Sequence, residues 1–479
     1  MKYLRRTALI AAASLAFALP AAAVTPATWT VAQRMSLPAQ GADIPDGFIS
    51  SLSCLSANSC VAAGAYANAQ GNILGLIETE RNGTWLSPKS LTAPAGAASD
   101  PGVTLYQVSC GAAGYCVAAG SYDTNSSTLP LLVEERGGHW SVGRALSLPA
   151  NALVKGQDAT IHAVSCKRST SCSAIGTYQD NNPVGSRGEG FVANEVGGVW
   201  RRATEIALPK SNFDPFVSLN QLSCPSAGNC VAVGSFIDAN DVTQALVVTE
   251  TNGVWRRGEA IAPPLDASRF AGASWSELTC LSDSSCAALG TFNTSTGAIE
   301  AMVANETGGS WGAATQVTLP PSAAANPHVT LFGFGGIACA SAQYCSLGGQ
   351  YEDAAGKYQG FLANEDAGTW SPAQDVDLPT GGASGGANGG IVAVSCPRND
   401  NCEASGSYLD ASGNYQALVV NEVNGVWQRA SEVTLPDGAS TVGVDGGVYA
   451  IDCWSSASCV GIGSYLKGSI TYEGFTISG

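Results

Sequence analysis

The feature that most constrains this chain is a pair of cysteines separated by five residues, which recurs eight times along 479 residues. Successive pairs begin 56 to 59 residues apart. A nearly fixed period of this length indicates a repeat architecture. The pairs are Cys54 with Cys60, Cys110 with Cys116, Cys166 with Cys172, Cys224 with Cys230, Cys280 with Cys286, Cys339 with Cys345, Cys396 with Cys402, and Cys453 with Cys459.

Other positions keep the same phase as the cysteines. In the second unit, Gly120 follows the second cysteine by four residues and Tyr122 follows by six, and Trp140 and Pro149 stand nine residues apart. Glycine and an aromatic residue recur at these positions in all eight units, and the tryptophan and proline in seven. A need shared by every unit, such as packing against the next, explains such residues better than a ligand does.

Each unit has the pattern of four short strands. In the seventh they are expected around Val392–Cys396, then at Glu403–Tyr408, Ala417–Asn421 and Val426–Leu435. Asn-Gly or Gly-Gly pairs between the third and fourth strands favour tight hairpin turns. With 57 glycines, 22 prolines and only 13% charged residues, the composition disfavours a helical bundle. The sequence therefore predicts an all-β, eight-bladed β-propeller of four-stranded antiparallel blades.

The two ends of the chain each carry part of a unit. The eighth unit stops at Gly479, after its third strand, whereas residues 27–38 carry a tryptophan and a proline nine apart with no cysteine pair before them. We expect this N-terminal strand to complete the C-terminal blade, which would remove a free sheet edge and close the ring.

This plan resembles secreted bacterial β-propeller repeat proteins and is loosely similar to kelch repeats. It lacks the double glycine that kelch repeats carry after the second strand. It is also similar to eight-bladed quinoprotein dehydrogenases, without the adjacent cysteine pair of their quinone site. Such families include hydrolases, lyases, lectins and scaffolds, so the resemblance implies a fold and leaves the function open.

The position of each cysteine pair, at the hairpin between the first and second strands, suits a local disulfide. We predict eight disulfides, as is typical of exported proteins. The alternative is a soft metal site, for which the units supply neither the Cys-x2-Cys spacing nor histidine partners.

The first 23 residues have the pattern of a secretory signal peptide, with Arg5 and Arg6 before an apolar stretch and three alanines at 21–23. Export by the twin-arginine route remains an alternative. We predict a single propeller domain over residues 24–479, secreted to the extracellular space or periplasm as a monomer. No later apolar stretch is long enough to span a membrane. A net charge of −16 disfavours nucleic acid as a partner.

Candidate ligand residues are those that break the repeat near the channel mouth. Asp46, Asn388 and Asp445 each stand eight residues before a first cysteine, in three neighbouring blades of the closed ring, and Asp158 has the same position in the third blade. Such oxygen ligands would suit Ca²⁺ or a polyol. The alternative is that these residues only form the turn that enters the strand.

A second group of candidates lies on the expected first strands. Its members are Tyr106, His162, Trp275, Glu277 and Tyr449, with Asn220 as a further irregular residue. We expect Trp275 and Glu277 to share a strand face, where stacking and acid chemistry on a glycan could combine. The alternative for Trp275 is to fill the core. The glutamate five residues before each tryptophan recurs seven times and is expected to bond turn backbone.

Three functions remain open on this evidence. The first is a secreted propeller that binds an extracellular glycan or protein at the channel mouth, with Ca²⁺ as a candidate cofactor. The second is a glycan-active hydrolase or lyase that uses carboxylates among Asp46, Asp158, Glu277 and Asp445. The third is a scaffold that presents loops without a pocket. The sequence contains no nucleophile elbow in a strand–turn–helix context and no calcium-loop motif.

Overall fold

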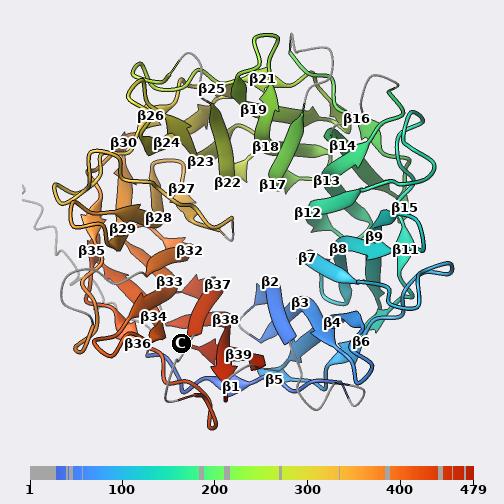
Figure 1. Ribbon diagram of the computed structural model, residues 1–479, viewed down its shortest axis with the longest axis horizontal. Coiled ribbons are helices and arrows are strands. Elements are labelled where there is room, and N and C mark those ends of the chain that lie inside the picture. Colours follow the sequence, from blue (N-terminus) through green and yellow to red (C-terminus); the bar gives the residue numbers. More distant parts are fainter. Residues whose placement is uncertain are drawn as a thin grey trace, which may run out of the picture.

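The computed structural model describes residues 28–38, 41, 47–56, 58–182, 188–209, 216–268, 272–333, 335–382, 389–440, 446–455, 457–468 and 471–479. Their strands form eight antiparallel blades arranged in a ring, which confirms the predicted fold (Figure 1). These residues include no α-helix, and so no helix that could cross a membrane. The predicted signal peptide, residues 1–23, lies outside the described residues.

The three inner strands of each blade are long and continuous, except for the short first strand of blade six. The first strands, which line the hub, are β2 (Gly47–Ser56), β7 (Thr104–Ala112), β12 (Thr160–Arg168), β17 (Val217–Ser226), β22 (Ala273–Ser282), β27 (Ile337–Ser341), β32 (Gly390–Arg398) and β37 (Gly446–Ser455). The second strands are β3 (Ser59–Ala67), β8 (Tyr115–Asp123), β13 (Ser171–Gln179), β18 (Asn229–Ile237), β23 (Ser285–Asn293), β28 (Tyr344–Glu352), β33 (Asn401–Leu409) and β38 (Ser458–Lys467). The third strands are β4 (Ile73–Arg81), β9 (Thr128–Arg136), β14 (Gly188–Val196), β19 (Thr243–Thr251), β24 (Ile299–Thr307), β29 (Tyr358–Asp366), β34 (Tyr415–Val423) and β39 (Thr471–Ser478).

The outer strand of blades one to seven is interrupted, which corrects the expectation of a continuous strand such as Val426–Leu435. Between its halves the chain leaves the ladder, and the Ala430 N–H donates instead to the Asp377 carbonyl of the preceding blade at 2.8 Å. The halves are β5 (Thr84–Trp85) and β6 (Lys89–Ser90), β10 (His139–Trp140) and β11 (Arg144–Ala145), β15 (Val199–Trp200) and β16 (Thr204–Glu205), β20 (Val254–Trp255) and β21 (Glu259–Ala260), β25 (Ser310–Trp311) and β26 (Thr315–Gln316), β30 (Thr369–Trp370) and β31 (Gln374–Asp375), and β35 (Val426–Trp427) and β36 (Ser431–Glu432).

The N-terminal segment completes the eighth blade, as predicted. Strand β1 (Gln33–Arg34) pairs antiparallel with β39, so that the last sheet has the order β1-β39-β38-β37. The indole N–H of Trp29 donates to Asn421 of blade seven at 3.3 Å. Trp427 makes the same bond to Asn364 of blade six. Trp29 is therefore the eighth blade's copy of the repeated tryptophan.

The repeated glycine is explained by an irregularity in the first strand. In blade two the pairing of β7 with β8 shifts between Leu105 and Gln107, a β-bulge that presses the first strand against the second. A Cβ on Gly120 would lie 1.9 Å from the Thr104 carbonyl oxygen, so only glycine fits there. The repeated aromatic residue, Tyr122 in this blade, is buried between blades, as the packing role requires.

All eight predicted disulfides form, with Cα–Cα distances of 3.9 to 4.2 Å, so the alternative of a soft metal site is wrong. Each closes a short hairpin loop and contributes roughly 2 kcal/mol in the chain-entropy model. Eight disulfides fit an oxidising compartment. The bonds join Cys54 to Cys60, Cys110 to Cys116, Cys166 to Cys172, Cys224 to Cys230, Cys280 to Cys286, Cys339 to Cys345, Cys396 to Cys402, and Cys453 to Cys459.

The second cysteine of every pair is buried, because it lies on the second strand, in the interior of the blade stack. A buried sulfur in a disulfide has a structural role and is not available to a ligand. These buried residues are Cys60, Cys116, Cys172, Cys230, Cys286, Cys345, Cys402 and Cys459.

Hydrogen bonds between blades run close to the hub as well. In blades one, two, three and seven, a serine before the first cysteine accepts the N–H of the next blade's first cysteine, as Ser109 does from Cys166 at 2.9 Å. At the closing junction Asp452 replaces serine, and its carboxylate accepts the N–H of Cys54. Burial raises the pKa of Asp452 to about 6, although this bond and the one from Cys453 act in the opposite direction.

The seven repeated glutamates are buried, but they do not mainly bond turn backbone, which corrects that expectation. Most of their hydrogen-bond partners among the described residues are side chains of the preceding blade, because the carboxylates point into the interface between blades. Glu195 accepts from Tyr115 at 2.5 Å and Glu250 accepts from Ser173 at 3.2 Å. Glu422 also accepts one backbone N–H, that of Cys402.

Candidate functional site

Three residues of the mouth site predicted from the sequence, Asp46, Asn388 and Asp445, lie outside the described residues. The proposal that they share a ligand therefore stays a prediction. Asp158 is described: it is exposed and forms a parallel β-bridge with Thr128 of the preceding blade. It does not line the cavity at the hub.

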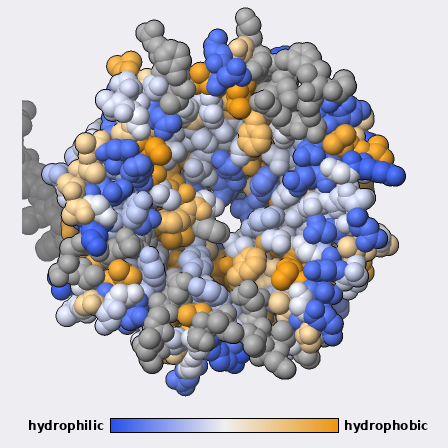
Figure 2. Space-filling model, viewed as in Figure 1, coloured by the Kyte–Doolittle hydropathy of each residue, from blue (hydrophilic) through white to orange (hydrophobic). Residues whose placement is uncertain are grey.

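The hub of the ring contains a cavity of about 610 Å³. The space-filling view shows an opening at the centre of the face it presents (Figure 2). The cavity lies between the first strands rather than at the connectors that enter them. Its lining comes mostly from residues one to four positions before the first cysteine, together with one segment of blade six. The disulfide cysteines themselves stay outside the lining.

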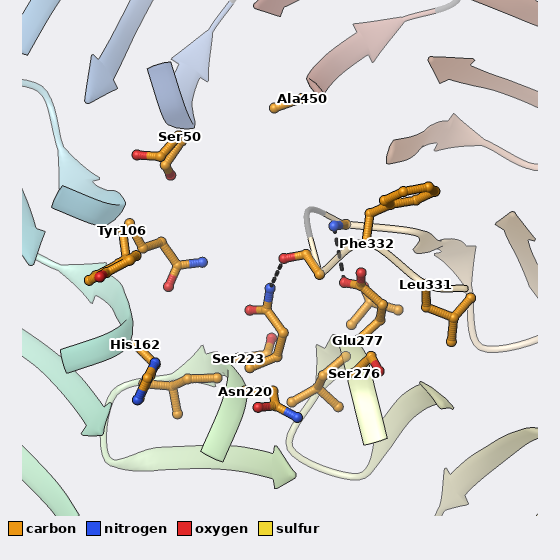
Figure 3. A pocket seen from close by; sticks show the side chains of 18 of the residues that line it. Ser50, Tyr106, His162, Asn220, Ser223, Ser276, Glu277, Leu331, Phe332 and Ala450 are labelled. Atoms are coloured by element: carbon orange, nitrogen blue, oxygen red, sulfur yellow. Dashed lines mark hydrogen bonds between the residues drawn. The ribbon is translucent and has the colours of Figure 1, made fainter. Parts of the chain in front are cut away.

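The β-bulge of the first strands decides which side chains reach this cavity. In blades one to five the pairing shift leaves one extra residue in the first strand, four positions before the cysteine. All five of these residues line the cavity. They are Ser50, Tyr106, His162, Asn220 and Ser276, which follow one another around the hub (Figure 3).

Part of this polar wall is fixed by bonds to the neighbouring blade. The Ser50 hydroxyl donates to the Leu105 carbonyl at 2.6 Å, and the Asn220 amide donates to the Trp275 carbonyl at 2.7 Å. In both cases the acceptor is the residue before the next blade's bulge. These two side chains therefore connect adjacent blades. The neighbouring side chains on the lining remain for contact with a ligand.

Tyr106 and His162 are the neighbours best placed to meet a ligand. Their ring centroids lie 6.3 Å apart, and Tyr106 is 44% exposed. His162 Nε2 lies 3.0 Å from the Thr177 hydroxyl. Burial lowers the pKa of His162, and the negative charge of Asp158, which acts to raise it, offsets this only in part. The imidazole is therefore neutral at pH 7. The pair therefore offers hydrogen-bonding groups and an aromatic face without charge.

Blade six breaks the pattern of the ring. Its first strand, β27, has five residues where the others have nine or ten. The residues before it, 331–333 and 335, form what we call the channel segment, and all of them line the cavity. The signal in the sequence is the interval of 59 residues from Cys280 to Cys339, the longest in the chain.

The bulge also separates Trp275 from Glu277, which corrects the expectation that they share a strand face. Trp275 pairs with Gly290 and Glu277 with Leu289, two consecutive residues of β23, so the two side chains lie on opposite faces. Trp275 is fully buried in the core between blades four and five. Glu277 lines the cavity wall but is only 1% exposed.

Tyr449 stands at the bulge of blade eight but is not among the residues that line the cavity. Its hydroxyl accepts a hydrogen bond from Ser464 at 3.3 Å, and the next residue, Ala450, takes the place on the lining. Blade eight thus contributes little polar surface to the hub.

The described lining carries almost no charge. Glu277 is its only carboxylate, and it contains no lysine or arginine. Among the residues that the structure describes, no cluster of three or more His, Cys, Asp or Glu side chains could hold a metal ion. The Ca²⁺ site depends on Asp46, Asn388 and Asp445, so it remains a prediction.

Aspartates of the loops between second and third strands serve the loops themselves. Asp410 accepts the N–H groups of Ser412 at 2.8 Å and Asn414 at 3.0 Å, and the Gln416 amide at 3.0 Å. Burial alone would raise the pKa of Asp410, but these bonds lower it to about 2. Asp238 and Asp353 make the same set of contacts.

Several lining residues were not singled out from the sequence. Gln107 and Gln221 occupy the position after the bulge, and Leu331 and Phe332 belong to the channel segment. The first two could have been found from their fixed distance of three residues before a first cysteine. The other two could have been found from the long interval of unit six.

No family model matches the chain, and no curated protein matches it. Among solved structures it resembles an ulvan lyase, with 10% identity over 94% of each chain and a TM-score of 0.42. It also resembles a puromycin-hydrolyzing peptidase of Mycobacterium tuberculosis, with 12% identity, a TM-score of 0.46, and coverage of 92% of this chain and 61% of that one. A third is the fucose-specific lectin of Aleuria aurantia, with 10% identity, a TM-score of 0.33, and coverage of 82% and 98%. These three likenesses are too weak to carry a functional argument.

Proposed function

We propose that this protein binds an extracellular glycan in the cavity at the hub of its propeller. The observation that carries the proposal is a cavity of about 610 Å³ whose lining combines polar side chains, such as His162 and Asn220, with apolar ones, such as Leu331 and Phe332. Pockets of roughly 300–1,000 Å³ are the usual size for small-molecule sites. A sugar offers both hydroxyl groups and an apolar ring face, so it matches both kinds of lining side chain.

Binding is favoured over hydrolysis by the carboxylates of the described lining. Glycoside hydrolases generally need two carboxyl groups roughly 5 to 9.5 Å apart. The described lining supplies one, Glu277, and its Oε2 accepts the Gly335 N–H at 3.0 Å. The hydrolase or lyase reading therefore rests on carboxylates outside the described residues, such as Asp46 and Asp445.

The test is a glycan-array screen of the protein without residues 1–23, with and without EDTA, followed by a product assay on every hit. We expect binding to a glycan without turnover. Turnover that is lost in Glu277→Gln would favour the enzyme instead. Loss of binding in EDTA would support a role for Ca²⁺, and unchanged binding would count against it.

Tyr106→Ala tests where the glycan binds. We expect affinity to fall about tenfold, because an aromatic contact and a hydroxyl are lost together. Phe48→Ala is the matched control: Phe48 is also a first-strand aromatic residue with 44% exposure, but it does not line the cavity. Equal losses in the two variants would refute binding at the hub.

The compartment and the assembly state are part of the same proposal. Secretion to the extracellular space or periplasm is supported by the predicted signal peptide and the eight disulfides. We propose a monomer. Cell fractionation of the full-length chain and light scattering of the purified protein test these two statements.

A further inference from the structure

The channel segment differs from the rest of the hub in both position and chemistry. In the other blades the first strand runs along the wall, whereas in blade six the chain leaves the wall and enters the channel (Figure 3). Gly333 and Gly335 have φ angles of +76° and +109°, which residues with a side chain rarely adopt. The segment therefore has a backbone path that the repeat does not provide.

Three other blades hold this segment in place. Gln221 of blade four donates its amide N–H to the Gly333 carbonyl at 3.2 Å. Glu277 of blade five accepts the Gly335 N–H at 3.0 Å, and the Gly335 carbonyl accepts the Val394 N–H of blade seven at 2.8 Å. These contacts from three sides fix the segment as a wall of the cavity.

The segment supplies a second aromatic surface to the cavity, besides that of Tyr106 and His162. Phe332 is 36% exposed, and it lies beside Leu331 on the side of the opening away from Tyr106 and His162 (Figure 3). The lining thus combines the hydrogen-bonding groups of blades one to five with the apolar side chains of Leu331 and Phe332.

The charges of the site restrict what that molecule can be. The described lining has no cationic side chain to pair with an acidic sugar, and the chain as a whole carries a net charge of −16. An anionic glycan would therefore lose its hydration without gaining a partner.

We propose that the channel segment selects neutral sugars, with Phe332 as the platform for the apolar face of a sugar ring. Glu277 is a positioning residue, which acts on the ligand through Gly335. At 1% exposure its carboxylate is covered too completely to make the contact itself. This inference rests on the proposed glycan binding for its ligand, but the role of Glu277 in holding the segment does not.

The first experiment needs no ligand. Amide hydrogen exchange is measured at residues 331–333 and 335 in the wild type, Glu277→Gln and Glu277→Ala. Glutamine keeps an oxygen that can accept the Gly335 N–H, so exchange should stay within about threefold of wild type, whereas alanine should speed it about tenfold or more. Equal exchange in wild type and Glu277→Ala would overturn the positioning role. If Glu277→Ala does not fold, Glu277→Asp replaces it: the shorter side chain withdraws the carboxylate from the Gly335 N–H, so faster exchange is expected at Gly335, and unchanged exchange would overturn the positioning role.

The second experiment measures affinity for the sugar found on the array and for an acidic sugar of the same size. Phe332→Ala should weaken binding of the neutral sugar about tenfold, and Phe332→Trp should retain it. Glu277→Gln should bind within about threefold of wild type and Glu277→Ala should bind more weakly. Weak binding by Glu277→Gln with normal exchange would show that the carboxylate contacts the ligand, and preference for the acidic sugar would refute the selection.

The two experiments separate the two ideas. If the wild type binds no glycan at all, the proposed function fails, while the exchange result still decides whether Glu277 holds the channel segment. If the wild type binds a neutral sugar and Phe332→Ala binds it equally well, glycan binding stands and the inference about Phe332 fails.

Discussion

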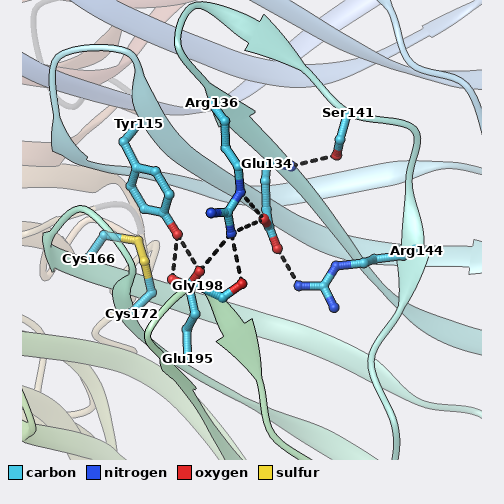
Figure 4. Close-up of polar contacts among 9 residues, drawn as sticks. All are labelled: Tyr115, Glu134, Arg136, Ser141, Arg144, Cys166, Cys172, Glu195 and Gly198. Carbon is cyan, nitrogen blue, oxygen red and sulfur yellow. Dashed lines mark hydrogen bonds and ion pairs between the residues drawn. A yellow bond between two sulfur atoms is a disulfide. The ribbon is translucent and has the colours of Figure 1, made fainter.

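Buried carboxyl groups occur at two kinds of interface in this ring, and the two treat them in opposite ways. Between blades two and three, Glu134 accepts hydrogen bonds from Arg136 at 2.6 Å and from Arg144 (Figure 4). Burial alone would raise the pKa of Glu134, but the two arginines hold it below its usual value. Arg136 also reaches Glu195 of blade three at 3.0 Å. This interface keeps Glu134 charged, whereas burial raises the pKa of Glu195 despite its contacts with Tyr115 and Arg136.

The two interfaces around the eighth blade carry carboxyl groups without such partners. Glu78 of blade one pairs across the sheet with Ala62, whose face packs on Ile462 of blade eight. Glu403 of blade seven lies at the other interface of blade eight. Both glutamates are at most 4% exposed. Neither Oε2 has a hydrogen-bond partner among the described residues.

Burial raises the pKa of Glu78 to about 8 and that of Glu403 to about 9, the latter with help from the charge of Glu422. Both groups are therefore neutral in the folded protein at pH 7. Equivalent positions elsewhere hold mostly valine or alanine, such as Val133 for Glu78 and Val117 for Glu403. The difference teaches that the repeat tolerates a buried acid either by pairing it or by keeping it protonated.

The largest expected effect concerns pH. The folded-state pKa values of Glu78 and Glu403 are raised above the unfolded value of 4.5. The contribution of these two groups to the free energy of unfolding is therefore fully present below about pH 4.5, and it is lost as pH rises towards 8 to 9. In the double variant Glu78→Val, Glu403→Val this loss between pH 5 and pH 9 should shrink by on the order of 10 kcal/mol. Urea unfolding at several pH values measures it. The exposed Glu259→Val is the control, and an unchanged slope in the double variant would remove the contrast between the two kinds of interface.

The next effect sharpens the other side of the comparison. Arg136→Ala should destabilise the protein by about 2 kcal/mol at pH 7, because it leaves Glu134 and Glu195 with fewer partners, and the partial exposure of Arg136 limits the loss. Part of that loss should return at pH 4, where the acids protonate. Arg256→Ala, an exposed arginine of blade four, should change stability by less than about 0.5 kcal/mol. A pH-independent loss would contradict the electrostatic account.

The smallest effect tests whether the interfaces differ apart from their charges. One variant replaces Cys166 and Cys172 by serine, and a second replaces Cys453 and Cys459 by serine. The two changes open hairpin loops of the same length, so each should cost about 2 kcal/mol in thermal unfolding. A clearly larger cost in blade eight would mean that its interfaces are weak for reasons beyond its neighbouring buried glutamates.

The sequence was sufficient to predict what every blade shares. Cysteine pairs, the glycine, the aromatic residue and the tryptophan each answer a packing need that recurs eight times, and Trp29 could be matched to the unfinished blade by the same reasoning. The hub was harder to predict. A one-residue bulge exchanges the faces of Trp275 and Glu277, and alternation along a strand cannot reveal it. Tyr106 and His162 were placed on first strands correctly, but the channel segment is visible in the sequence only as a slightly longer interval.

The pairing of β1 with β39 joins the two ends of the described chain, which are synthesised at different times. The amide of Thr30 bonds to Ser478, so the first strand to be synthesised must wait for the last. Blades one to seven contain all of their own strands and can form while the chain is still emerging. The eighth sheet is therefore assembled at the end, and a chain interrupted before that point keeps Ala417 and Val419 of blade seven uncovered.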